Sequence, residues 1–589
     1  MSAFTIDAQD FDFYTKIAVP APTFCPECRA QRRMTWRNER SLYRRRCALT
    51  GKDVISCFGP ESGITVYDRD VWWSDQWDPL ASGAPYDFNE PFFVQFRKLL
   101  EQTPMPAVFN NRTVRSNYTN HTGDMKDCYL VFASWGGENI LYAGKEMRCK
   151  DSADLLTTKD SELCYECIAV EKAYRTLFSE NCESCTDSYF LYECRGCSNC
   201  FGCVNLRSKS YHIFNEPYSK ENYFAALERM DLGNHESLIQ AKRKFEELKT
   251  RSVRKYANIL NCQSVTGDML YRVDTCTECY DLAEDVRNCK FINNGGMKLY
   301  DTYDSYGAGA GAELLHESVD SGANGSLLCF GIVVWGGRDV FYSYNCENCT
   351  SIFGCIGLRN KSYCILNKQY TKESFDELRT KIIEHMQAMP YTDRQGRAYR
   401  YGEFFPSELS PFAYNETIAQ EYYPLTREQA DERGFRWRDP ESRNYTVTQA
   451  SGTLPNYIKD VPDSILDDVI GCAHTGTCDE QCTTAFKIIA PELQFYRKLN
   501  LPLPRLCPNC RHYQRLKQRN PTRLWHRACQ CAGSTSSPQA GGASDGGAYR
   551  NTGEHVHGAA HCPNEFETPY APERPEVIYC EQCYNAEVV

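Results

Sequence analysis

Short apolar runs, broken by Asn, Asp, Ser and Gly, fill the middle of the chain, as at residues 189–192. Such runs between turn-forming residues are typical of strands. Cysteines recur among them at an 18-residue spacing, at Cys128, Cys164, Cys182 and Cys200, and Glu146 occupies the missing position. A second series lies three residues further along, at Cys149, Cys167, Cys185 and Cys203. A fixed period indicates stacked repeats. We therefore predict a parallel β-helix, a solenoid with an 18-residue period, and leave its hand open.

This pattern occurs twice. Residues 194–223 match residues 346–375 at a constant offset. The tetrapeptide Thr-Gly-Asp-Met at 122–125 also recurs at 266–269. In the second copy the grid is blurred by a Gly/Ala run at 307–312 and by other insertions. Amphipathic helices follow each copy: Ser219 and Thr371 are predicted helix caps, and a further helix is expected at about 235–254. Helices of this kind cover the exposed end of a solenoid.

The two ends of the chain are also copies of each other. Residues 3–47 align without a gap on residues 485–529. The alignment brings Cys25-x-x-Cys28 onto Cys507-x-x-Cys510 and Cys47 onto Cys529. Two thiolates three residues apart can bind one tetrahedral ion, which a second pair completes. Each end is therefore predicted to be a zinc-ribbon or treble-clef-like module.

The fold class expected is mainly β, with two parallel β-helix halves, helical caps and these duplicated modules on either side. The predicted domains are an N-terminal zinc module with an aromatic helix (1–106), the first half (107–255), the second half (256–389), a connector rich in Tyr, Phe and Pro (390–470) and a C-terminal zinc module (471–589). The connector should contain a short helix after Thr426 that ends at Gly434. A Gly/Ser/Ala-rich flexible loop at 532–553 is expected within the last module.

The metal sites are predicted from cysteine spacing. At the C-terminus, Cys580-x-x-Cys583 is the simplest partner for the pair at 507 and 510. Residues 577–580 resemble residues 54–57, so Cys57 is a candidate counterpart of Cys580 and Cys47 a candidate fourth ligand at the N-terminus. A second C-terminal zinc is expected around Cys529 and Cys531, with two to four ions in all. The full set of candidate ligands is Cys25, Cys28, Cys47, Cys57, Cys472, Cys478, Cys482, Cys507, Cys510, Cys529, Cys531, Cys562, Cys580 and Cys583.

Some of the C-terminal cysteines outside the duplicated pairs could instead be buried thiols. For the cysteines of the repeats, a column of reduced core thiols is favoured over zinc, an iron–sulfur cluster or redox sensing. Small apolar cysteine suits a stack of rungs about 4.8 Å apart.

Arginines and aromatic residues follow both duplicated Cys-x-x-Cys pairs, which we call knuckles. Such a surface beside a zinc fold suits contact with phosphates and stacking on bases. The alternatives are a solvated basic face, or arginines that dock on the acidic body of the same chain. The candidate nucleic-acid contacts are Arg29, Arg33, Arg37, Arg44, Arg45, Arg46, Arg511, Arg515, Lys517, Arg519, Arg523 and Arg527.

Composition limits the functional classes. The net charge is −11, yet segments 25–52 and 505–527 are strongly basic, so the rest of the chain is acidic. No signal peptide and no apolar stretch of membrane-spanning length is visible, so a cytoplasmic, reducing setting is expected, and there the 33 cysteines are metal ligands or packed thiols. The sequence does not predict an oligomeric state.

Three functions follow from these features. Zinc-binding, non-enzymatic recognition of nucleic acid, with RNA preferred over DNA, comes first. A protein-interaction scaffold with structural zinc comes second. The third is an enzyme, either a metal-dependent nuclease or a carbohydrate-active β-helix. The sequence contains no Walker loop, no Gly-x-Ser-x-Gly, no His-Glu-x-x-His and no dinucleotide fingerprint, and only His512 and His526 stand near a knuckle as possible general bases. We therefore lean away from an enzyme.

Three motifs together carry a resemblance to a protein family. They are the Phe-Tyr-x-Lys-x-x-x-Pro-x-Pro-x-x-Cys-Pro-x-Cys-Arg string at both ends, the Phe-Gly-Cys-x-x-Leu-Arg-x-Lys-Ser-Tyr segment of both halves, and the ending at 579–584. The chain resembles an uncharacterised family of large Cys-rich zinc-ribbon proteins from uncultured, small-genome bacteria. The resemblance implies zinc and a bacterial cytoplasmic setting, and it implies no mechanism.

Overall fold

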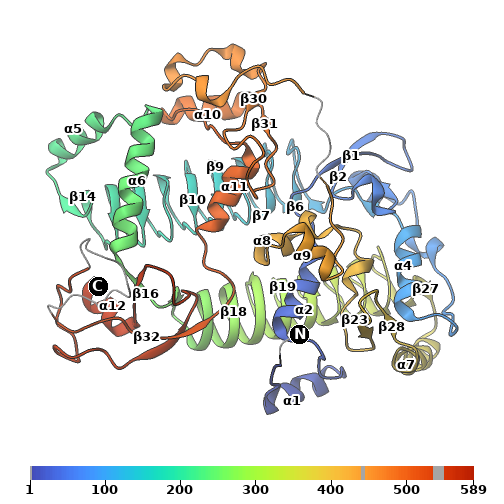
Figure 1. Ribbon diagram of the computed structural model, residues 1–589. Coiled ribbons are helices and arrows are strands. Elements are labelled where there is room, and N and C mark those ends of the chain that lie inside the picture. The colour runs from blue at the N-terminus through green and yellow to red at the C-terminus, as the bar shows by residue number, and fades with distance from the viewer. Residues whose placement is uncertain (1–2, 440–444, 535–548, 589) are drawn as a thin grey trace.

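The computed structural model describes residues 3–439, 445–534 and 549–588, and it is mainly β with many parallel strands (Figure 1). The first sheet contains eight strands, and a three-stranded sheet precedes it along the chain. Their strands are β5 (Asn110–Asn111), β6 (Asn120–Gly123), β7 (Phe132–Trp135), β8 (Glu138–Leu141), β9 (Lys150–Leu156), β10 (Tyr165–Ile168), β11 (Tyr174–Leu177), β12 (Thr186–Tyr192), β13 (Ser198–Val204), β14 (Ser210–Ile213) and β15 (Glu216–Pro217).

The second sheet contains eleven strands and lies beside the first (Figure 1). Its strands are β17 (Ile259–Leu260), β18 (Gln263–Gly296), β19 (Leu299–Gly309), β20 (Ala312–Val319), β21 (Ser326–Cys329), β22 (Ile332–Trp335), β23 (Arg338–Phe341), β24 (Tyr344–Glu347), β25 (Thr350–Phe353), β26 (Ser362–Ile365) and β27 (Lys368–Gln369). No helix within the described ranges is long and apolar enough to cross a membrane.

The repeat of the first sheet is 12 residues, not the predicted 18. Thr186 of β12 pairs in parallel with Ser198 of β13, and Ser198 pairs with Ser210 of β14. The cysteine spacing misled the prediction because the backbone conformation and the burial pattern both repeat every three residues. Residues with positive φ recur at every third position from Arg112 to Phe214, and inward-facing, buried side chains also recur every three residues. Because 12 and 18 are both multiples of three, the cysteines predicted on the 18-residue grid all face inward without forming one column.

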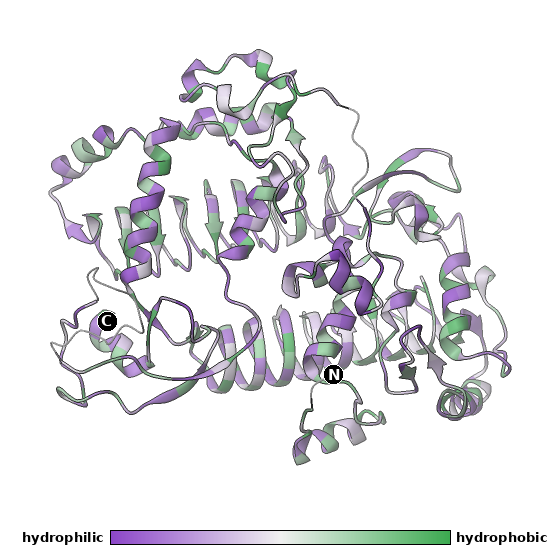
Figure 2. Cartoon of the chain, in the orientation of Figure 1, coloured by the Kyte–Doolittle hydropathy of each residue, from purple (hydrophilic) through white to green (hydrophobic). Residues whose placement is uncertain are grey.

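The second sheet begins with longer repeats. Leu299 pairs with Val286 and with Ala312, an offset of 13 residues, whereas later strands return to 12. The Gly/Ala run at 307–312 covers the end of β19, the two residues after it and the first residue of β20. A Cβ on Gly309 would lie 2.0 Å from the carbonyl oxygen of Gly296, so this position requires glycine. Figure 2 shows hydrophilic and hydrophobic residues interspersed along the strands of both sheets.

Both sheets end in the same way, as the duplication predicts. The Asn215 amide bonds to the backbone N–H and C=O of Val204, and the Asn367 amide does so with Ile356. The predicted caps are confirmed. Ser219 and Thr371 accept hydrogen bonds at the starts of α5 (Lys220–Met230) and α7 (Lys372–Ala388), and α6 (His235–Arg251) follows α5.

The connector contains the expected helix after Thr426, α9 (Arg427–Glu432), and the backbone turns at Gly434 with φ of 79°. Of the predicted loop 532–553, residues 535–548 lie outside the described residues. The remaining helices are α1 (Ala8–Lys16), α2 (Pro26–Met34), α3 (Arg69–Trp72), α4 (Phe92–Gln102), α8 (Ile418–Tyr422), α10 (Ala490–Leu499), α11 (Pro508–Lys517) and α12 (Glu581–Val588).

Each end module packs against the sheet that is farther from it along the chain. Helix α2 of the N-terminal module packs on β19 and β20 of the second sheet, and α11 of the C-terminal module packs on β9 of the first sheet. The C-terminal module also pairs its strand β34 (Val577–Tyr579) with β16 (Val253–Lys255), which lies between the two sheets along the chain. The two end modules therefore link the two sheets to each other.

Candidate metal centre

Four cysteines form a first cluster, which we call the knuckle cluster: Cys472, Cys482, Cys507 and Cys510. Cys507 is the N-cap of α11 and Cys510 lies in its first turn, while Cys472 follows the short strand β30 (Ile470–Gly471). All four sulfurs lie within 4.8 Å of one another. A helix N-terminus favours thiolates, because its free N–H groups carry partial positive charge.

The sulfur geometry of this cluster fits a tetrahedral ion. Metal–sulfur bonds of about 2.3 Å place neighbouring sulfurs about 3.8 Å apart. The Cys472 and Cys510 sulfurs are separated by 3.8 Å. Backbone N–H groups also point at the sulfurs, that of Cys507 at Cys472 over 3.3 Å and that of Thr483 at Cys507 over 3.4 Å. Side-chain hydrogen bonding with Cys472 and Cys510 lowers the pKa of Cys507.

Cys478 lies beside the knuckle cluster. Its sulfur is 3.7 Å from that of Cys510, and with His474 and Glu480 it forms a further set of donors that shares Cys510. Glu480 also forms an ion pair with Lys517, with a distance of 2.7 Å from Nζ to Oε1. Cys478 therefore belongs to the same metal-ligand neighbourhood, as predicted for the segment 472–482.

The second four-cysteine cluster, called here the terminal cluster, consists of Cys529, Cys562, Cys580 and Cys583. Two of its residues lie in the connection between two paired strands: Cys529 follows β32 (Trp525–Ala528) and Cys562 precedes β33 (Glu565–Thr568). Cys580 and Cys583 lie at the start of α12. The sulfurs of Cys562 and Cys580 are 3.9 Å apart, and a hydrogen bond from Cys529 lowers the pKa of Cys580 to about 4.

The predicted pairing of Cys507 and Cys510 with Cys580 and Cys583 is therefore wrong. The two pairs lie in separate clusters and in separate hydrophobic cores. Each pair finds its partners on another segment, at 472–482 or in the connection between β32 and β33. The sequence alone could not fix this, because every cysteine pair is an equally good donor until the chain is folded.

Cys531 is placed with two histidines. Cys531, His555, His557 and Cys583 form a set whose donor atoms lie within 4.8 Å of one another, and we call it the histidine set. The candidate ligands predicted from cysteine spacing do not include either histidine, and they also omit His474 and Glu480. The available signal was the Cys529-x-Cys531 pair followed by His555-x-His557.

The N-terminal module keeps the knuckle backbone without the cluster. Cys25 caps α2 with φ and ψ of −64° and 157°, almost the same as −64° and 159° for Cys507. Yet within the described part of the chain, Cys25, Cys28, Cys47 and Cys57 belong to no group of three or more donors that could hold a metal ion. The aligned segment starts at residue 485, so the duplication brings no counterpart of Cys472 or Cys482.

The terminal cluster is also reduced in the N-terminal copy. Ala48 donates to Val66 as its aligned residue Gln530 donates to Ile578, so the counterpart of Cys580 is Asp68 and not Cys57. The register of the paired strands, with Arg46 opposite Asp53 and Ala528 opposite Glu565, makes Thr50 the counterpart of Cys562. Only Cys47 is retained. The expectation of an N-terminal site with Cys25, Cys28, Cys47 and Cys57 therefore lacks the ligand geometry that a metal requires.

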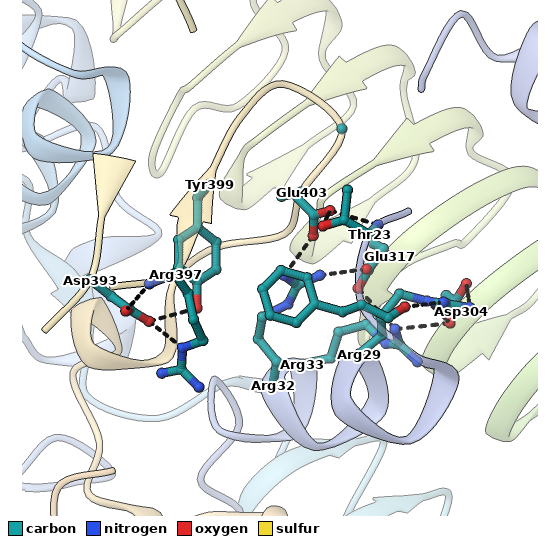
Figure 3. A network of polar contacts seen from close by, with 12 residues as sticks. Thr23, Arg29, Arg32, Arg33, Asp304, Glu317, Asp393, Arg397, Tyr399 and Glu403 are labelled. Carbon is teal, nitrogen blue, oxygen red and sulfur yellow. Dashed lines mark hydrogen bonds and ion pairs between the residues drawn. The ribbon is translucent and has the colours of Figure 1, made fainter. Parts of the chain in front are cut away.

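Most arginines on the module helices are turned inward. Arg29 is 1% exposed and donates to both carboxylate oxygens of Asp304 over 2.9 Å, and Arg33 pairs with Asp304 and Glu317 (Figure 3). The C-terminal copy does the same on the first sheet, where Arg511 and Arg515 pair with Asp154. The interatomic distances are 2.6 and 2.8 Å.

Arg37 and Arg519 continue this pattern. Arg37 pairs with Asp320 over 2.6 Å, and Arg519 pairs with Asp281 over 2.5 Å. Arg29, Arg33, Arg37, Arg511 and Arg515 are buried, and the side chain of Arg519 is only 15% exposed. These six residues are thus not available to phosphates, contrary to their assignment as nucleic-acid contacts. Charge excess in the sequence could not distinguish an internal from an external acidic partner.

The remaining basic candidates lie closer to solvent. Arg44, Arg46, Lys517 and Arg523 are exposed. Arg45 and Arg527 are half-buried and donate to backbone carbonyls, including those of Gly59 and Ala571.

The cysteines of the sheets behave as packed thiols. Within the described residues, none of the 33 cysteines forms a disulfide bond. Cys128, for example, donates to the carbonyl of Lys126 and to that of Gly137 in the next turn, and burial raises its pKa to about 11. Among the described residues, no cysteine between 128 and 364 joins a group of three or more metal donors. The thiols are thus packed in the core, as the sequence favoured, but they do not form the expected single column.

Comparison with known proteins adds no identity. No protein-family model matches the chain, and no curated protein matches it. Among solved structures, a putative acetyltransferase from Desulfovibrio desulfuricans G20 is similar at 9% identity, over 51% of this chain and 76% of that one, with a TM-score of 0.11. A similarity at that level carries no argument about fold or activity.

Proposed function

We propose that this chain is a zinc-stabilised, non-enzymatic scaffold protein that acts through protein interactions. In this proposal its two sheets are β-solenoids with turns of 12 or 13 residues, and its C-terminal module is held by zinc. The observation that carries the proposal is the inward use of the module arginines. Because Arg29 and Arg511 neutralise carboxylates of the same chain, the main sequence argument for nucleic-acid binding is lost.

Zinc is the proposed ion because of the donor chemistry. Four cysteine ligands in a buried tetrahedral arrangement are typical of structural zinc, which leaves no open position for a substrate. The knuckle cluster offers four cysteines of which Cys472, Cys507 and Cys510 are buried, and all four in the terminal cluster are buried. Structural zinc contributes directly to folding. Clusters of cysteine donors and packed core thiols suit a reducing compartment, and a cytoplasmic setting is part of the proposal.

The two nuclease candidates find no support as general bases. His512 is buried and pairs with Glu421 over 3.1 Å, and His526 is exposed between Glu565 and Glu567. Among the described donors, neither histidine belongs to a set that could hold a metal ion. A hydrolytic water activated by metal needs a base within hydrogen-bond reach, and these positions do not provide it.

The test separates the scaffold from a nucleic-acid binder. Protein purified without oxygen is applied to immobilised RNA and DNA over a range of salt concentrations. We expect weak retention that is the same for wild type and for a protein carrying Arg44→Ala and Arg46→Ala. Strong salt-dependent retention that this double variant loses would overturn the scaffold proposal in favour of nucleic-acid binding. Arg112→Ala with Arg115→Ala is the matched control, because these arginines are exposed between β5 and β6 of the three-stranded sheet.

A further inference from the structure

Cys583 belongs to two sets of metal donors. Its sulfur completes the terminal cluster with Cys529, Cys562 and Cys580, and it also completes the histidine set with Cys531, His555 and His557. Within each set the donor atoms lie within 4.8 Å of one another. A thiolate has more than one lone pair, so one sulfur can bind two ions at once.

The histidine set has short contacts between its donors. His557 Nε2 lies 3.2 Å from the Cys583 sulfur, and His555 Nδ1 lies 3.4 Å from the Cys531 sulfur. Cys531 is fully buried and Cys583 nearly so, and His555 is 7% exposed. Two sulfurs and two imidazole nitrogens are a common tetrahedral zinc set.

The second nitrogen of each histidine is held by an acceptor. His555 Nε2 lies 2.8 Å from a carboxylate oxygen of Glu587, and the two side chains are 1% and 0% exposed. His557 Nδ1 lies 2.7 Å from the carbonyl oxygen of Ala560. Metal-binding histidines characteristically donate their other N–H to a carboxylate or carbonyl, which fixes the tautomer and the ring. Here each acceptor leaves the nitrogen that faces the sulfurs free of a proton.

The buried thiolates are supported in the same way. The Asn551 amide donates to the Cys531 sulfur over 3.3 Å and is held by Tyr579, and the Asn564 amide donates to the Cys580 sulfur over 3.3 Å. If the terminal cluster held the only ion of this core, Cys531 and His555 would be buried metal donors that bind no metal. A second divalent ion there also offsets the charge of five thiolates gathered in one core.

We propose that the C-terminal module holds a binuclear metal centre in which the Cys583 thiolate bridges two ions. One ion is bound by Cys529, Cys562, Cys580 and Cys583, and the other by Cys531, His555, His557 and Cys583. The inference rests on the proposed metal binding and extends it. Together with the knuckle cluster, it gives three ions per chain.

The test uses the full chain purified without oxygen, with zinc counted by elemental analysis and replaced by cobalt(II). The variant is His555→Gln with His557→Gln, and the matched control is His561→Gln, an exposed histidine that lies outside both sets. We expect the double variant to lose one ion per chain while the control keeps all. In the cobalt protein, two ions joined through one sulfur couple magnetically, so the electron paramagnetic resonance intensity per cobalt should be low in wild type and should rise in the double variant.

Two results would overturn the bridge. One is an unchanged ion count in the double variant. The other is a loss of one ion with unchanged intensity per cobalt, which would mean separate mononuclear sites. His557→Gln alone is a second variant that spares the buried His555–Glu587 pair, in case the double variant does not fold. Failure of the underlying metal binding would look different, because wild type itself would then contain no stoichiometric metal.

Discussion

Arg29 and Asp304 lie 275 residues apart in sequence and form a buried two-pronged ion pair, with Nε to Oδ1 and Nη2 to Oδ2 both at 2.9 Å. Burial alone would raise the pKa of Asp304, but the guanidinium groups of Arg29 and Arg33 bring it below its ordinary value. The equivalent pair in the other copy is Arg511 with Asp154. Each end module therefore packs on a sheet through an arginine at the aligned position of its knuckle.

Breaking this pair should be costly. Arg29→Ala leaves the Asp304 carboxylate buried with one cation fewer, and loss of one partner from a buried pair destabilises proteins by about 3–5 kcal/mol. We expect a loss of that order in the free energy of unfolding, measured by urea denaturation with circular dichroism. Arg112→Ala serves as control. It breaks an exposed pair with Asp124 and should cost less than about 1 kcal/mol. Equal effects of the two substitutions would contradict the docking role.

The buried carboxyl of Glu146 should make stability depend on pH. Burial inside the first sheet raises its pKa from 4.5 to about 8. Between these values the folded state keeps a proton that the unfolded state has lost, so stability falls as pH rises, by up to about 1.4 kcal/mol per pH unit from this group. Glu146→Gln should remove that contribution and be more stable than wild type at pH 7 to 8.

The control for this effect is Glu138→Gln, because Glu138 is paired with Lys126 near the surface and its pKa is lowered. Thermal melts from pH 4 to pH 9 provide the comparison. A wild type and a Glu146→Gln variant with parallel stability profiles would show that Glu146 is not protonated in the folded chain.

Metal removal should unfold the C-terminal module first. The knuckle and terminal clusters bring together separate segments of the C-terminal module. In the two sheets, the described cysteines pack in the core and join no group of donors that could hold a metal ion. We expect a chelator under reducing conditions to expose cleavage sites within 471–589 in limited proteolysis. Fragments that span both sheets should persist. A cleavage pattern unaffected by the chelator would contradict a structural role for the metal.

The sequence predicted the elements better than their partners. The parallel strands, the caps at Ser219 and Thr371 and the duplicated ends follow from local patterns, and local patterns survive folding. The turn length did not follow, because cysteines at multiples of three obey both 12 and 18. Tertiary pairing was equally hidden: Cys507 meets Cys472 and not Cys580, and Arg29 meets Asp304 rather than a phosphate. Only the fold decides between donors or carboxylates of the same kind.

The most direct test of the central claim compares the duplicated knuckles by metal content. Among the residues that the structure describes, the C-terminal copy has assembled ligands and the N-terminal copy does not. Protein carrying Cys507→Ser and Cys510→Ser, purified without oxygen, should contain one zinc ion fewer per chain than wild type. Protein carrying Cys25→Ser and Cys28→Ser should contain the same number as wild type. Loss of an ion from the N-terminal variant, or no loss from the C-terminal one, would contradict the assignment of metal to the C-terminal module alone.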